Sequence, residues 1–167
     1  MRPTRLKNAV HLRFVADAML GSLARKLRIL GFDTHYYREG DDDGIIRLAV
    51  EEGRVILTAD VPLASLAGRR GATAVLLSGR TDSARLRALT EWAAALHVLF
   101  EKGDPRCSIC NGALTGVPKS GVAEKVPSSV ASSHRIFYLC DSCGKVYWKG
   151  GHWKKLRSYD RMMREAR

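Results

Sequence analysis

A short apolar strand that runs directly into an amphipathic helix, within residues 14–31, constrains the fold more than any other feature of this sequence. The strand ends at Asp17. The helix after it carries apolar residues at helical spacing, at Leu20, Leu23, Leu27 and Leu30. Such a change of period is typical of α/β proteins, which bind ligands beyond the carboxyl ends of their strands. We therefore expect Asp17 to lie at that edge of a sheet.

This succession of strand and helix repeats to about residue 103. We expect strands at 12–16, 33–37, 55–58 and 72–77, and helices at 18–30, 43–52, 62–67 and 83–96. Strands that alternate with helices predict a parallel sheet flanked by helices, with right-handed crossovers. At 167 residues and 46% hydrophobic content, the chain can form one such domain with a small appendage.

Two CxxC pairs follow, Cys107 with Cys110 and Cys140 with Cys143. Each pair lets two thiolates face one ion, and two pairs complete a tetrahedral Cys₄ site, so the spacing predicts structural Zn²⁺. The alternatives are redox-active pairs, as in a thiol oxidoreductase, or an iron–sulfur centre. Zinc is favoured because this β-rich stretch has few apolar residues and therefore few other sources of stability.

The net charge of +11 is concentrated at the two ends of the chain. Residues 1–13 carry four basic and no acidic side chains, and residues 145–167 carry eight basic and two acidic ones. Basic ends suggest a polyanionic partner, with solubility as the alternative explanation. The sequence has no apolar run of membrane-spanning length and no apolar signal region after its first residues, so we expect a cytoplasmic protein.

These patterns predict four parts: a basic N-terminal tail at 1–11, an α/β domain at 12–103, a zinc ribbon at 104–153 and a basic C-terminal tail at 154–167. The boundary before the ribbon is marked by the turn-forming sequence Lys-Gly-Asp-Pro at 102–105.

Acidic residues follow successive predicted strands. Asp17 comes after the first strand, Asp41–Asp43 open the second helix, Asp60 follows the third strand and Asp82 lies in the loop after the fourth. Carboxylates gathered at one edge repel one another unless a cation lies between them. Oxygen ligands suit Mg²⁺ or Mn²⁺, which support phosphodiester hydrolysis. The alternative for each residue is a helix N-cap, which contributes about 1 kcal/mol, and Asp82 is either a cap or an outer ligand.

Two stretches resemble a known family. The sequence from Phe14 to Thr34 is similar to the opening of the PIN-like ribonuclease family named after the C-terminal region of the Mut-seven exonuclease. The sequence from Asp42 to Asp60 resembles the last two acidic motifs of PIN nucleases in general. The resemblance extends over about residues 13–153 and includes the cysteine module.

The resemblance implies a PIN-like sheet with an appended zinc ribbon, and a Mg²⁺- or Mn²⁺-dependent ribonuclease. The catalytic residues that it implies are Asp17, Asp42, Asp43 and Asp60, with Asp17, Asp42 and Asp60 as the metal ligands. Two positions depart from the family pattern: no room remains between Asp17 and Asp42 for a further acidic helix, and Ala59 stands where members often have arginine. The alternative function is a non-cleaving RNA- or ribosome-binding protein on the same scaffold.

Basic and aromatic residues are the candidate RNA contacts. On the first helix, Arg25 and Lys26 could bind the RNA backbone, or could simply be solvated. Beyond Cys143, aromatic residues alternate with lysines, which suits stacking on unpaired bases, although the aromatics could instead pack against the main domain. The full set is Arg25, Lys26, Lys145, Tyr147, Trp148, Lys149, His152, Lys154 and Lys155. The expected partner is RNA, with tRNA, rRNA and the ribosome as candidates, and no membrane.

Overall fold

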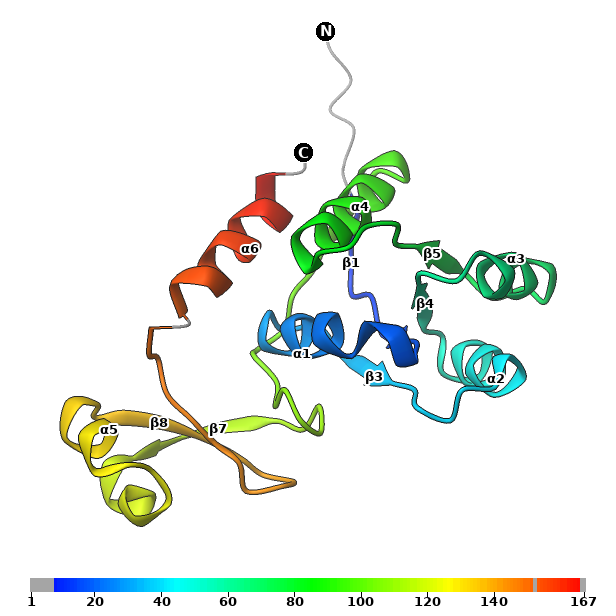
Figure 1. The fold of residues 1–167 in the computed structure, drawn as a ribbon. Coiled ribbons are helices and arrows are strands. Elements are labelled where there is room, and N and C mark those ends of the chain that lie inside the picture. Colours follow the sequence, from blue (N-terminus) through cyan, green and yellow to red (C-terminus); the bar gives the residue numbers. More distant parts are fainter. Residues whose placement is uncertain (1–7, 152, 166–167) are drawn as a thin grey trace, which may run out of the picture.

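The computed structural model of the protein describes residues 8–151 and 153–165 (Figure 1). The strands are β1 (Asn8–Val10), β2 (Phe14–Ala16), β3 (Thr34–Tyr36), β4 (Val55–Thr58), β5 (Ala74–Leu76), β6 (Val98–Phe100), β7 (Leu114–Pro118), β8 (Ile136–Cys140) and β9 (Val146–Tyr147). The α-helices are α1 (Gly21–Ile29), α2 (Asp42–Glu52), α3 (Val61–Arg69), α4 (Asp82–Ala95), α5 (Ser128–Ser133) and α6 (Trp153–Glu165). Short 3₁₀-helices are η1 (Ala18–Leu20), η2 (Lys119–Gly121) and η3 (Ala123–Lys125). The expected first helix is thus a 3₁₀ turn followed by α1.

The main sheet has the strand order β3-β2-β4-β5, and all neighbouring strands in it are parallel. In the centre of the sheet, Val15 lies between His35 of β3 and Ile56 of β4. Parallel neighbours need long crossover connections, and the helices provide them. The predicted fold class, a parallel sheet flanked by helices with a small cysteine-containing module, is confirmed.

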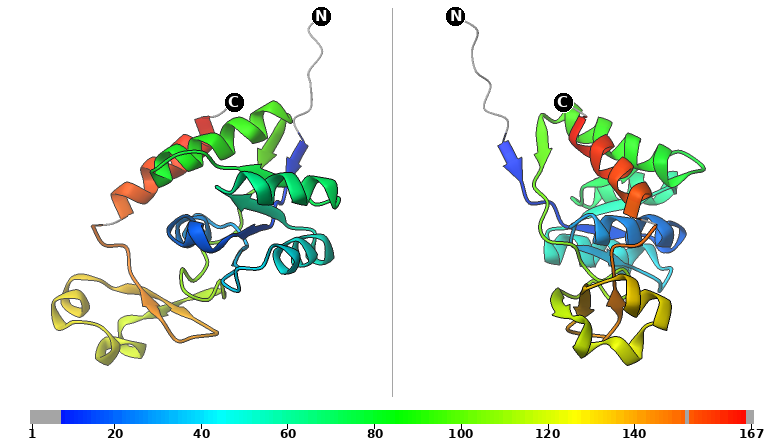
Figure 2. Two further views of the ribbon diagram at one scale, coloured as in Figure 1. Left: turned by 45° about the vertical axis from the view of Figure 1, so that its right-hand side comes forward. Right: turned by 90° about the vertical axis from the view of Figure 1, so that its left-hand side faces the viewer.

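Helices cover both faces of this sheet, and the molecule has three layers in this region (Figures 1 and 2). Phe14 and Ala16 belong to the core formed with α1 and α4, whereas Val15 belongs to the core formed with α2 and α3. All three side chains are fully buried. Successive strand residues point to opposite faces, so a strand buried on both sides is apolar at every position, and this is why β2 could be predicted.

Both ends of the described chain return to the main domain. Strand β1, within the range expected as an N-terminal tail, pairs in parallel with β6. Helix α6, which begins one residue before the range expected as a C-terminal tail, packs along α4 and buries Tyr159 and Met163 in the core on the α1 side of the sheet. No helix in the described ranges combines the length and the apolar character needed to cross a membrane.

Residues 106–147 form the second, smaller module. Its antiparallel sheet has the order β7-β8-β9, and Phe137 at its centre is fully buried with Val122 and Val146 around it. The linker before this module lies against the end of α1. Gly103 donates a hydrogen bond to the carbonyl of Gly31 over 3.1 Å, and a side chain at Gly31, whose φ is +95°, would collide with that linker backbone.

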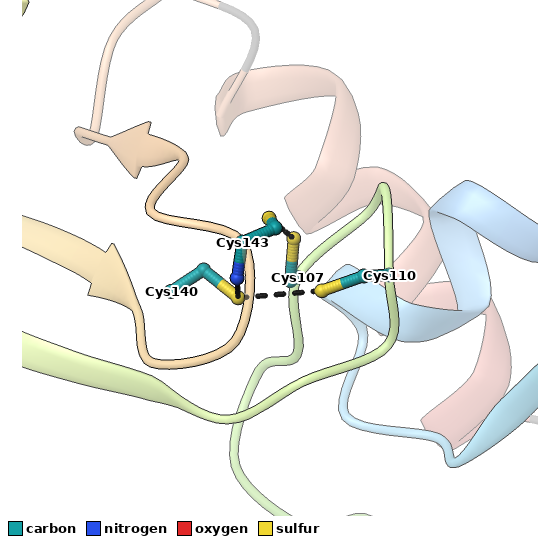
Figure 3. A group of neighbouring side chains, drawn as sticks. All are labelled: Cys107, Cys110, Cys140 and Cys143. Carbon is teal, nitrogen blue, oxygen red and sulfur yellow. Dashed lines mark hydrogen bonds between the residues drawn. The ribbon is translucent and has the colours of Figure 1, made fainter.

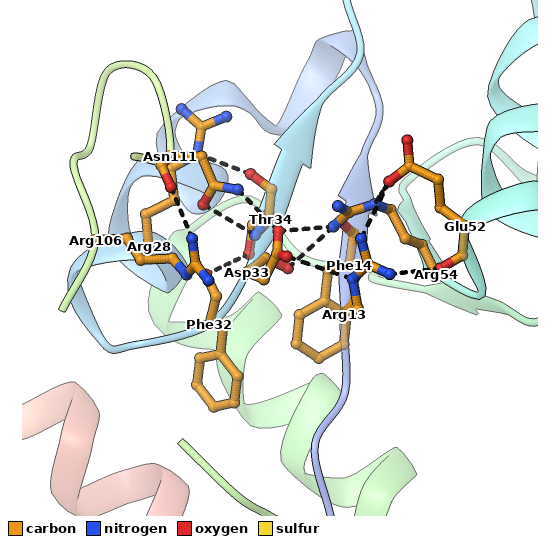
Figure 4. Close-up of polar contacts among 10 residues, drawn as sticks. All are labelled: Arg13, Phe14, Arg28, Phe32, Asp33, Thr34, Glu52, Arg54, Arg106 and Asn111. Carbon is orange, nitrogen blue, oxygen red and sulfur yellow. Dashed lines mark hydrogen bonds and ion pairs between the residues drawn. The ribbon is translucent and has the colours of Figure 1, made fainter. Parts of the chain in front are cut away.

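A buried arginine joins the two modules, and Figure 4 shows its contact with Thr34 in the main domain. The Arg28 guanidinium, on a residue that is 6% exposed, donates to the carbonyls of Thr34 (2.8 Å), Ser108 (3.0 Å) and Ile109 (2.9 Å). Asn111 reinforces the contact: its amide oxygen accepts from the Thr34 N–H at 3.2 Å, and its NH₂ group donates to Asp33 at 2.8 Å. The loop between the first two cysteines is therefore tied directly to the main domain.

Candidate functional site

The strand order places a change of chain direction at the carboxyl edge of the main sheet. The chain leaves β2 toward α1 on one face and leaves the neighbouring β4 toward α3 on the other face. In open α/β sheets this change of direction marks the usual ligand-binding position. Asp17 directly follows β2, and Asp60 lies two residues after Thr58, the last residue of β4. The two predicted carboxylates thus flank this position.

Asp17 is a buried carboxylate, 7% exposed. Its Oδ1 caps η1 by accepting from the Met19 N–H at 2.8 Å, and its Oδ2 accepts a hydrogen bond from the Thr58 hydroxyl. The Asp17 N–H donates to the Leu57 carbonyl at 3.1 Å, which ties its backbone to β4. No ion pair to Asp17 occurs among the described residues. Burying a charge without a partner of opposite sign is costly, so Asp17 is the carboxylate at this edge with the strongest need for a cation.

Thr58 connects Asp17 to the segment that carries Asp60. Its hydroxyl donates to Asp17 and accepts from the Asp60 N–H at 2.9 Å. Asp60 itself is exposed, and its Oδ1 caps α3 by accepting from the Leu63 N–H at 3.0 Å. Thr58 was not among the predicted site residues; the signal for it was the Thr-x-Asp spacing at the end of a buried strand.

The three aspartates before α2 have different surroundings. Asp41, which was not predicted to be a site residue, is the N-cap of α2: it accepts from the Gly44 N–H at 2.7 Å and from the Tyr37 hydroxyl. The Tyr37 hydrogen bond lowers the pKa of Asp41, and in turn the pKa of Tyr37 rises to about 12. Asp43 is exposed and forms an ion pair with Arg70. Asp42 is exposed in the first turn of the helix.

Asp82 is neither a cap nor fully exposed. Thr81 caps α4 by accepting from the Ala84 N–H at 3.2 Å, while Asp82 accepts from Ser22 at 2.7 Å and from Lys26. Burial alone would raise the pKa of Asp82, but the hydrogen bonds from Lys26 and Ser22 outweigh burial and lower it. Lys26, a candidate RNA contact, therefore has an intramolecular partner, whereas Arg25 beside it is exposed.

Four cysteines converge in the smaller module (Figure 3). Cys107 and Cys110 lie on the loop before β7, Cys140 is the last residue of β8, and Cys143 lies in the turn that follows. The Sγ atoms of Cys107 and Cys143 are 3.6 Å apart, and those of Cys110 and Cys140 are 3.4 Å apart. Four ligands at about 2.3 Å around a tetrahedral Zn²⁺ would be separated by about 3.8 Å. The cluster is therefore consistent with the zinc ribbon that the CxxC spacing predicts.

The polar groups around Cys107 favour its thiolate form. The Tyr147 hydroxyl lies 3.1 Å from Cys107 Sγ and also contacts Ser108, whose N–H donates to it at 3.1 Å. Burial would raise the pKa of Cys107, but hydrogen bonds from Tyr147 and from the backbone N–H groups of Cys110 and Ile109 lower it. Tyr147, predicted as an RNA contact, thus uses its hydroxyl within the cysteine site.

The ligand atoms of the four cysteines all lie within 4.8 Å of one another. Among the described residues, no other group of three or more His, Cys, Asp or Glu side chains is gathered this closely. The aspartates at the sheet edge are more widely spread. Among the other candidate RNA contacts, Lys145 and Lys149 are exposed and Trp148 is half-buried. His152 and the side chains of Lys154 and Lys155 lie outside the described residues.

Comparison with known proteins gives one family. A family model described as the Mut7-C RNAse domain matches residues 12–159, which cover both modules and the first half of α6. No curated protein and no solved structure matches the chain. The family implies ribonuclease activity and an RNA substrate, in agreement with the resemblance seen in the sequence. The sheet, the cysteine cluster and this match together lead to one conclusion: the chain belongs to the Mut7-C RNAse domain family.

Proposed function

We propose that the chain is a Mg²⁺- or Mn²⁺-dependent ribonuclease whose catalytic site is the carboxyl edge of the main sheet, around Asp17. The observation that carries the proposal is the buried Asp17 carboxylate, which lies at the change of strand direction and has no ion pair among the described residues. Its oxygen donors are those that Mg²⁺ and Mn²⁺ prefer.

The residues of the edge have distinct roles in this proposal. Asp17 and Asp60 hold the cation, and Thr58 fixes Asp17 by its hydrogen bond while it positions the Asp60 backbone. Asp42 completes the acidic set. Asp43, the other residue implied at this position, is less suited because Arg70 already neutralises it.

When bound, the cation supplies a water of lowered pKa and stabilises negative charge on the leaving oxygen. The Met19 N–H and the Thr58 hydroxyl keep the Asp17 oxygens in place. Zn²⁺ in the ribbon has a structural role, because four cysteines leave no open coordination position.

The test is the nearly isosteric substitution Asp17→Asn. It removes one charge at the buried position while the amide oxygen can still accept from Thr58 or Met19. We expect cleavage of single-stranded RNA with Mn²⁺ present to fall by more than about 100-fold, because losing a metal ligand should exceed the 10- to 100-fold effect of losing its outer partners. Binding of the same RNA should change little.

The matched control is Glu91→Gln, which removes a negative charge from an exposed residue of α4. It should cleave at the parent rate. Equal cleavage by Asp17→Asn and the parent would contradict the assignment. A parent that binds RNA tightly but leaves it intact with Mn²⁺ would support the alternative, a non-cleaving RNA-binding protein.

A further inference from the structure

A cavity of about 600 Å³ lies between the two modules, and none of the predicted catalytic aspartates lines it. Its walls come from the end of α1, the linker before the ribbon, strands β8 and β9, and the beginning of α6. The volume is within the range of sites that hold small organic ligands. The structure therefore contains a second candidate binding site, which the acidic edge does not explain.

The walls of the cavity are mainly apolar, and they include three aromatic rings. Tyr138, Tyr147 and Trp148 line it, and Ile29 and Leu156 add aliphatic surface. Two of the rings are held in place. The Tyr147 hydroxyl accepts a hydrogen bond from the Ser108 N–H in the cysteine loop, and the Trp148 indole packs against Gly150, which has no side chain. Preformed flat walls of this kind suit a planar ring inserted between them.

The charge of the lining favours an anionic ligand. Lys145 and Lys149 are exposed at the cavity, Asp104 is the single acidic residue in its lining, and the Lys149 ammonium lies 5.8 Å from the centroid of the Tyr138 ring. Aromatic platforms combined with lysines are how proteins bind unpaired nucleotides: the ring stacks on the base, and the ammonium groups neutralise the phosphates.

We propose that this cavity, between the aromatic face of β8–β9 and the beginning of α6, holds one unpaired base of the RNA. The inference rests on the proposed function, because it adds a subsite for the same substrate. Helix α1 runs between the two sites: Asp17 lies just before η1, and Ile29 at the far end of α1 lines the cavity. Nine residues of α-helix span about 13 Å. The bound base is therefore a nucleotide some distance along the strand from the cleaved bond.

The experiment measures RNA binding rather than cleavage, with zinc-loaded protein in the Asp17→Asn background. The probes are a short fluorescent single-stranded RNA and an abasic oligomer of the same length and charge, and fluorescence anisotropy gives the affinity. Trp148→Ala should weaken binding of the normal RNA about tenfold, since one stacked base contributes of that order. Trp148→Phe should keep most of the affinity. Both variants should bind the abasic oligomer as weakly as the Asp17→Asn protein does.

The control is Ile136→Ala, on the same strand as Tyr138 but 64% exposed and outside the cavity lining. It should bind both probes like the Asp17→Asn protein. Equal affinity of Trp148→Ala and the Asp17→Asn protein for normal RNA would overturn the inference. A Trp148→Ala variant that lost as much affinity for the abasic oligomer as for normal RNA would also overturn it, and so would a cavity that bound acidic peptides in place of RNA. A protein that binds RNA through Trp148 but never cleaves it would refute the proposed function and leave this subsite standing.

Discussion

The two sets of candidate metal ligands in this protein differ in how completely the fold assembles them. The four cysteines converge from the loop before β7 and from the end of β8 with its following turn. The sulfur atoms of Cys107 and Cys143 are 3.6 Å apart, and those of Cys110 and Cys140 are 3.4 Å apart. The aspartates reach the same sheet edge from separate loops, but most are already engaged: Asp60 caps a helix, and Asp43 and Asp82 form ion pairs. The difference indicates that the fold by itself assembles the cysteine site. Under the proposed function, the acidic edge is completed only when cation and RNA bind.

The largest effect expected is the loss of zinc. Cys107→Ser, or removal of the metal with a chelator, should unfold the ribbon, because structural zinc in small modules contributes about 10 kcal/mol or more. Elemental analysis should find about one zinc per parent chain, and circular dichroism should follow the loss of structure. An unchanged melting temperature after metal removal would mean that the cysteine site is not structural.

The next largest effect is expected from Arg28→Ala, which tests whether the cysteine loop stabilises the main domain. The substitution removes the donor from three carbonyls, those of Thr34, Ser108 and Ile109. We expect a loss of about 3 kcal/mol in the free energy of unfolding, since a buried hydrogen-bonded charge is replaced by unpaired carbonyls. Urea denaturation checks this, with the exposed Arg25→Ala as the matched control on the same helix. If the two variants were equally stable, the modules would be independent.

Asp33, at the same junction, should make stability depend on acid pH. Burial alone would raise its pKa, but hydrogen bonds from Arg54 and Asn111 lower it to about 2. A lowered pKa stabilises the folded state above the unfolded pKa of about 3.9, and this contribution disappears as the pH falls toward 2. Asp33→Asn should therefore cost about 2 kcal/mol at pH 7 and progressively less in acid. A difference from the parent that did not change between pH 7 and pH 2 would contradict this.

The smallest effect expected is that of Thr58→Val at the acidic edge. The isosteric change removes the hydroxyl that donates to Asp17 and accepts from Asp60. We expect RNA cleavage to fall about tenfold, as for the loss of an outer partner of a metal ligand, while Thr58→Ser should retain activity. If cleavage by Thr58→Val matched that of the parent, Thr58 would have no positioning role.

Much of this fold could be predicted because its signals are local. The apolar run of β2, the apolar stripe of α1 and the CxxC spacing each depend on a few neighbouring residues. The pairing of β1 with β6 and the return of α6 through Tyr159 and Met163 depend on contacts between distant segments, so the sequence indicated only basic tails there. At the acidic edge, the sequence could place Asp17 and Asp60 beyond their strands, but not the Thr58 hydroxyl between them or the ion pairs of Asp43 and Asp82.

The most direct test of the central proposal is a crystal structure with Mn²⁺, using anomalous diffraction to separate manganese from the zinc of the ribbon. We predict a manganese peak at coordination distance from an Asp17 carboxylate oxygen, on the side facing Asp60, and no such peak in the Asp17→Asn protein. Manganese that is absent from this edge in the parent, or bound equally in both proteins, would contradict the proposed catalytic site.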